Sequence, residues 1–147
     1  MTAWVDLERD APAIAAFARE RVFQRVCFLA TVRTDGSPRV HPVTPWIHDG
    51  RLLVRMYRSS PKGADLRRDA RFALHSMMDN DEGIGGEVAM RGTAAEVIDP
   101  SFVRAAYDAI GESGERDLVL FEFSPTDVAT CVYEGDEAIR DRWRATG

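Results

Sequence analysis

The chain has 147 residues, enough for one domain with a core of its own, and we expect a single domain over residues 1–147. Its 24 acidic and 19 basic residues give a formal net charge of −5, which disfavours binding to nucleic acid because phosphates would be repelled. No segment is long and apolar enough to cross a membrane, and the acidic N-terminus differs from a signal peptide. We therefore expect a cytoplasmic protein with no nucleic-acid or membrane partner.

The first half of the chain predicts a helix followed by strands that are joined by tight turns. Asp10 is a candidate N-cap for a helix that ends near Phe23. Strand-like runs follow at 26–33, 38–49 and 51–57, with Asp-Gly pairs at 35–36 and 49–50. Such pairs are typical of hairpin turns. In the third run apolar and polar side chains alternate, which indicates a half-buried strand.

The second half predicts further strands and two more helices. The expected elements are a short helix at 64–69, strands at 72–78 and 87–98, a helix from Asp99 to Gly111, and two strands at 118–123 and 128–133. Gly92 lies inside the longest of these strands and predicts a bulge or bend there. Together the two halves predict a mostly antiparallel sheet decorated with helices.

Residue types that bind metals occur at unsuitable spacings. His41 and His48, seven apart in one expected strand, would point to opposite faces, and His75 lies in another strand. The acidic turn at 79–83 lacks the glycine and glutamate positions of a calcium loop. We therefore expect no metal site. A loop at 58–63 combines hydroxyl and cationic side chains and could instead receive a phosphate.

Three stretches in this order, 28–43, 59–69 and 87–92, resemble the pyridoxamine 5′-phosphate oxidase-like proteins. The fold of that family is the FMN-binding split β-barrel. The resemblance implies a mainly β (α+β) fold, with about six to seven mostly antiparallel strands, an N-terminal helix and one or two further helices.

The resemblance also implies the residues that bind the cofactor. By position, Arg39 and Lys62 match the family's phosphate-binding cations, and Ser59 or Ser60 matches the hydroxyl beside them. A guanidinium, an ammonium and a hydroxyl can jointly hold a phosphate monoester.

Four further positions match the family near the flavin. Arg55, Met56 and Tyr57 match the strand whose backbone runs along the ring, and Glu87 stands where the vitamin B6 oxidases have a glutamine. Trp46 could cover an aromatic ring or belong to the core. No side chain is assigned as a catalytic acid or base, because hydride chemistry belongs to the cofactor.

These matches predict an FMN-dependent oxidoreductase that acts on a small molecule. Pyridoxamine 5′-phosphate is not the expected substrate, because residues 136–144 contain no histidine of the family's Arg-Leu-His type. A deazaflavin-dependent reductase and a non-catalytic flavin-binding or haem-binding module remain as alternatives. Because the family completes its pocket with a second subunit, we expect a homodimer with the cofactor at the interface, and His41, Trp46 and the last strand as contacts.

Overall fold

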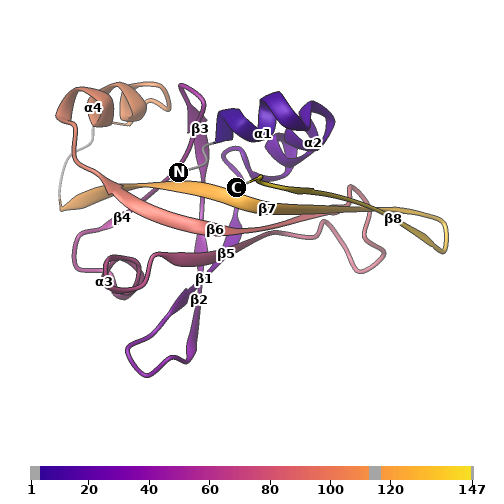
Figure 1. The fold of residues 1–147 in the computed structure, drawn as a ribbon, viewed down its shortest axis with the longest axis horizontal. Coiled ribbons are helices and arrows are strands. Elements are labelled where there is room, and N and C mark those ends of the chain that lie inside the picture. Colours follow the sequence, from indigo (N-terminus) through magenta and orange to yellow (C-terminus); the bar gives the residue numbers. More distant parts are fainter. Residues whose placement is uncertain (1–3, 113–116, 147) are drawn as a thin grey trace.

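The computed structural model of the chain describes residues 4–112 and 117–146 (Figure 1). Its eight strands form one antiparallel sheet, in the order β2-β1-β5-β6-β7-β4-β3, with β8 also paired to β7. The strands are β1 (Cys27–Val32), β2 (Pro38–Val43), β3 (Trp46–His48), β4 (Arg51–Tyr57), β5 (Arg71–Ser76), β6 (Glu87–Val97), β7 (Leu118–Glu134) and β8 (Glu137–Arg144). The helices are α1 (Trp4–Asp10), α2 (Pro12–Val22), α3 (Pro61–Arg68) and α4 (Pro100–Asp108).

The mainly antiparallel, split-barrel-like α+β fold expected from the sequence is confirmed, with one strand more than expected. The long strand β7 organises it. One edge of β7 pairs with β6, and the other edge is shared between β4, along Leu118–Phe123, and β8, along Asp127–Glu134. Figure 1 shows β7 running across the length of the molecule. None of the helices in the described residues is long and apolar enough to cross a membrane.

The predicted bulge at Gly92 is confirmed, since the register of β6 and β7 shifts between Arg91 and Gly92. A Cβ atom on Gly92 would lie 2.0 Å from the carbonyl oxygen of Ser124, so only glycine fits this approach. Opposite the bulge lies Pro125, which a regular ladder would not accept. The bulge therefore lets β7 continue, and the prediction of two separate strands at 118–123 and 128–133 was wrong.

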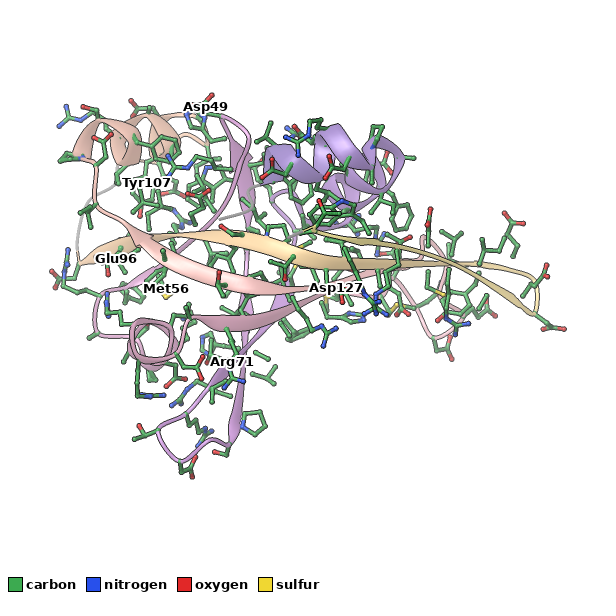
Figure 2. All side chains as sticks on the ribbon, viewed as in Figure 1. Asp49, Met56, Arg71, Glu96, Tyr107 and Asp127 are labelled. Atoms are coloured by element: carbon green, nitrogen blue, oxygen red, sulfur yellow. The ribbon has the colours of Figure 1, made fainter. Side chains whose placement is uncertain are left out.

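Two hydrophobic clusters lie on opposite faces of β4. Leu52, Val54 and Met56 join the main core with α1, α2 and the inner faces of the other strands, as the alternation predicted. Leu53 points the other way and is also fully buried, because α4 covers that face with Tyr107 (Figure 2). The strand is therefore buried on both sides rather than half-buried.

Other sequence predictions need correction near the ends of elements. The single run at 38–49 is two strands, because Pro45 interrupts it and its carbonyl accepts the Gln24 N–H instead. Asp10 ends α1 and does not cap α2, whose N-cap is Ala11 without a side-chain bond. Both α1 and β8 were missed. Asp99 does cap α4, accepting a hydrogen bond from the Ser101 N–H.

Candidate functional site

The loop after β4 ends in a capped helix. Ser60 is the N-cap of α3, and its Oγ accepts a hydrogen bond from the Gly63 N–H at 3.2 Å. Pro61 follows at the first helical position, where its missing N–H costs nothing. Because the hydroxyl oxygen of Ser60 serves as acceptor, its proton is free to be donated to a ligand. The helix N-terminus adds a partial positive charge beside it.

Lys62 lies in the first turn of α3. It is the single lysine of the chain, and the other 18 of the 19 lysines and arginines are arginines. Its side chain is buried, with 9% exposure, and burial lowers the pKa of its ammonium group. Within residues 4–112 and 117–146 it has no hydrogen-bond or ion-pair partner. A buried cation without a counterion is unfavourable in a folded protein, and this makes Lys62 a candidate for binding an anion.

Arg39 reaches the same place from β2, the strand at one end of the sheet. Its Nε donates to Asp65 Oδ2 at 2.7 Å, and Thr31 Oγ1 on β1 donates to the same oxygen at 2.8 Å. Burial alone would raise the pKa of Asp65, but the hydrogen bonds from Arg39, Thr31 and Arg68 lower it below its usual value. The two terminal nitrogens of Arg39 make no bond to the described residues and can serve a ligand.

His41 lies two residues further along β2, on the same face as Arg39. Its pKa is lowered by burial first and then by the positive charges of Lys62 and Arg39. Lys62 and Arg39 are therefore both close enough to the imidazole of His41 to act on its charge. We call the group of Arg39, Ser60 and Lys62 the anion cradle, since two cations, a hydroxyl and a helix N-terminus can together hold a dianionic phosphate.

The remaining predicted residues lie outside the anion cradle. Arg55 pairs with Glu112 at 2.9 Å on the face of β4 toward α4, whereas Tyr57 and Ser59 are exposed at the end of β4 and in the following loop. Met56 is buried beneath the start of α3, where its sulfur faces Gly63 (Figure 2). Its side chain belongs to the core.

Glu87 lies on β6 among different neighbours. Its Oε1 accepts a hydrogen bond from Tyr133 Oη at 3.2 Å, and its Oε2 lies 3.6 Å from His75 Nε2. Glu87 is therefore grouped with other titratable side chains on the outer face of the sheet. Among the described residues no cluster of His, Cys, Asp or Glu is arranged to hold a metal ion.

Trp46 is fully enclosed. It packs against Tyr107 with ring centroids 5.9 Å apart, and its Nε1 donates to the Ala106 carbonyl at 3.1 Å. With 1% exposure it cannot cover a bound ring or contact another subunit. Sequence reasoning missed Thr31 and Asp65, which position the cradle. One signal in the sequence did indicate the cradle: Lys62 is the single lysine of the chain, and all its other basic residues counted with lysine are arginines.

Solved structures with this fold include a haem-binding protein, a NimC/NimA family protein and an F420 reductase. A haem-binding protein from Mycobacterium smegmatis matches with a TM-score of 0.70 and 21% identity, over 90% of this chain and 58% of that one. A NimC/NimA family protein from Clostridium acetobutylicum matches with 0.69 and 16%, over 96% and 94%. An F420 reductase matches with 0.57 and 21%, over 74% and 91%. At these identities the likenesses establish the fold alone.

No curated protein matches the sequence. The sequence family described as pyridoxamine 5′-phosphate oxidase, however, matches residues 11–131, which include β1 to β6 and the whole anion cradle. The match thus spans most of the chain. The chain therefore belongs to the pyridoxamine 5′-phosphate oxidase-like family, as its sequence motifs predicted.

Proposed function

We propose that the chain is an FMN-dependent oxidoreductase whose anion cradle holds the cofactor phosphate. The observation that carries this proposal is Lys62, a buried cation with no counterion among the described residues. The phosphate of FMN carries close to two negative charges at neutral pH and would supply that counterion. Arg39 and Ser60 would add directed hydrogen bonds, and Asp65 would keep Arg39 in place.

FMN bound here would supply hydride or electron transfer, and the chain would supply binding and orientation. Among the described residues β2 pairs on one edge only, with β1, so the backbone around Val40 on its other edge would be open to the ring. Pro38 and Pro42 on this strand lack N–H groups, which keeps another strand from pairing at that edge. The substrate we propose is a small molecule other than pyridoxamine 5′-phosphate, since β8 presents arginines and no histidine.

Two alternatives use the same fold. A deazaflavin coenzyme also carries a phosphate, and the likeness to an F420 reductase favours it as the second candidate. A haem-binding role is favoured by the likeness to the M. smegmatis protein. Neither alternative explains the buried lysine better than FMN does. A buried ammonium group should pair with a compact anion, and the phosphate of FMN is one.

We also propose a two-fold homodimer with the cofactor at the interface. The cradle lies at the open edge of the sheet, where one subunit leaves a flavin partly exposed. The exposed side chain of His41 is available as a contact there, whereas Trp46 is not. Light scattering at micromolar concentration should give the mass of a dimer, and a monomer with flavin bound would contradict this proposal.

The test of the cradle compares FMN with riboflavin, which lacks the phosphate. Lys62→Ala and Arg39→Ala should each weaken FMN by roughly 1.5–3 kcal/mol, the value of a hydrogen bond to a charged group, and leave riboflavin unchanged. Arg104→Ala removes the same charge from the exposed face of α4 and serves as the control. Equal losses for both ligands would rule out the phosphate assignment.

Activity separates an oxidoreductase from a carrier. Stopped-flow absorbance should detect reduction of the bound flavin by a nicotinamide donor, or its reoxidation by oxygen or a quinone, faster than for free FMN. Pyridoxamine 5′-phosphate should leave the spectrum unchanged. A protein that ignores FMN but turns over the reduced deazaflavin coenzyme would establish the second candidate instead.

A further inference from the structure

His41 is a titratable side chain beside the anion cradle. The register of β1 and β2 places it opposite Leu29, whose side chain lies in the main core. Arg39 lies two residues earlier on β2, and side chains two apart in a strand share a face. The imidazole is therefore on the side of β2 from which Arg39 reaches Asp65 of α3, and it is exposed there.

The charged groups that act on this imidazole are both cations in the described part of the chain. Partial burial is the largest cause of the lowered pKa of His41, and the charges of Lys62 and Arg39 add to it. The paired strand β1 brings only uncharged side chains opposite, at 28–30. Asp65, the carboxylate of the neighbouring helix, is already bonded to Arg39. His41 is therefore mostly neutral at pH 7 in the free protein.

Both ring nitrogens of His41 are available to a proton or a ligand. Within residues 4–112 and 117–146 its imidazole makes no hydrogen bond or ion pair. The other two histidines are placed differently: the ring of His48 packs against Phe102 at 5.6 Å, and Nδ1 of His75 lies 2.6 Å from the Ser76 carbonyl oxygen. A neutral imidazole beside two cations will take up a proton more readily once an anion cancels their field.

We propose that His41 takes up a proton from solvent when a phosphate monoester enters the anion cradle, and that it thereby makes the site prefer a monoester to a diester. The inference rests on the proposed function, in which the monoester is FMN. A monoester carries close to two negative charges at neutral pH, and a diester about one. Asp65 neutralises part of the charge of Arg39, so Lys62 faces a dianion with little help. A proton on His41 adds positive charge, and a monoanion favours that proton less.

The proposal fixes the sign of a pH dependence. If the bound state keeps His41 protonated to a higher pH than the free state does, FMN binds more tightly as the pH falls. Between about pH 8 and about pH 6.5 the affinity of the wild type should rise about fivefold or more, since a pKa shift of one unit corresponds to tenfold. His41→Gln keeps a polar side chain that does not titrate, and its affinity should change less than about twofold. The range stops above about pH 6, where the phosphate itself takes up a proton.

The preference for a monoester is tested with the methyl ester of FMN, which has the same ring and sugar chain and one charge fewer. At about pH 6.5 the wild type should bind FMN more tightly than the ester, and His41→Gln should reduce this preference about fivefold. The size of the methyl group cancels, because both ligands are compared in both proteins. His48→Gln makes the same substitution on β3 and should leave the preference unchanged.

NMR titration of the histidine ring protons measures the protonation itself, and the two variants assign the signals. The pKa of His41 should be higher in the FMN complex than in the free protein, and it should rise less with riboflavin, which lacks the phosphate. An unchanged pKa in the FMN complex would overturn the inference and leave the proposed function standing. So would a loss of affinity in His41→Gln that is equal for FMN and riboflavin, because His41 would then act on the ring or on a subunit contact. A protein that binds no FMN would overturn both.

Discussion

Arg39 and Asp65 join the end strand β2 to helix α3 through an ion pair with Nε and Oδ2 2.7 Å apart. The pair fixes both cations of the cradle, because Lys62 precedes Asp65 by three residues in the same helix. It also leaves them unequal: Arg39 has a carboxylate partner, whereas Lys62 has none among the described residues. A ligand phosphate would therefore gain most from the lysine.

Asp65→Asn should destabilise the protein by about 3 kcal/mol, because it leaves a partly buried guanidinium without its charge partner. Urea unfolding at pH 7 gives the value. Asp69→Asn is the control, since its partner Arg71 is largely exposed and its loss should change little. A loss at position 65 no larger than at 69 would contradict the positioning role.

The same pair predicts a pH dependence. The pKa of Asp65 is lower in the folded protein than the usual value of about 3.9, so the folded state binds fewer protons and gains stability above that value. This contribution is lost as the pH falls through the folded pKa. The stability difference between the wild type and Asp65→Asn should therefore be constant from pH 7 to 5 and shrink below pH 4.

Lys62→Met should make the ligand-free protein more stable and reduce its stabilisation by FMN. Burial lowers the pKa of Lys62, so the protonated side chain destabilises the folded state at neutral pH. Removing that charge should stabilise the protein by about 1 kcal/mol, and the same concentration of FMN should raise the Tm of the wild type more than that of the variant. The gain should shrink as the pH approaches 10.5, because the folded state loses its proton first. A variant less stable than the wild type at pH 7 would contradict this account.

Much of the fold could be predicted because its signals are local. Alternation at 51–57, the glycine of the bulge and the cap of α4 each follow from a few adjacent residues. The strand β8 could not be found this way, since it is exposed along most of both faces and buries only Trp143. The sequence gives an equally weak signal for helix α1, because it has only seven residues and buries two of them, Trp4 and Leu7.

The candidate site was only partly accessible from the sequence. The resemblance pointed to Arg39, Lys62 and either Ser59 or Ser60, and in the structure Arg39 of β2 is bonded through Asp65 to α3, whose first turn holds Ser60 and Lys62. The sequence could not reveal that Asp65 accepts a hydrogen bond from Arg39, because these two residues lie 26 positions apart in the chain.

Gly92→Ala should destabilise the protein strongly, by about 3 kcal/mol or more, because the new Cβ would lie 2.0 Å from the Ser124 carbonyl oxygen. Gly111→Ala is the matched control: nothing lies within 4 Å of its Cβ, and only its positive φ of 73° opposes the change. That control should cost about 1 kcal/mol. Similar losses in urea unfolding would mean that β7 can move away from the bulge.

Trp46→Phe should lower stability without changing the affinity for FMN. The substitution empties part of the cluster under α4 and removes the donor that satisfies the Ala106 carbonyl, a loss of about 2–3 kcal/mol. Trp143→Phe is the control, because Trp143 makes only a 3.4 Å bond to Asp10 and should cost less. Urea unfolding measures the stability and FMN titration the affinity. Weaker FMN binding by Trp46→Phe in a protein that is still fully folded would return this tryptophan to the cofactor site.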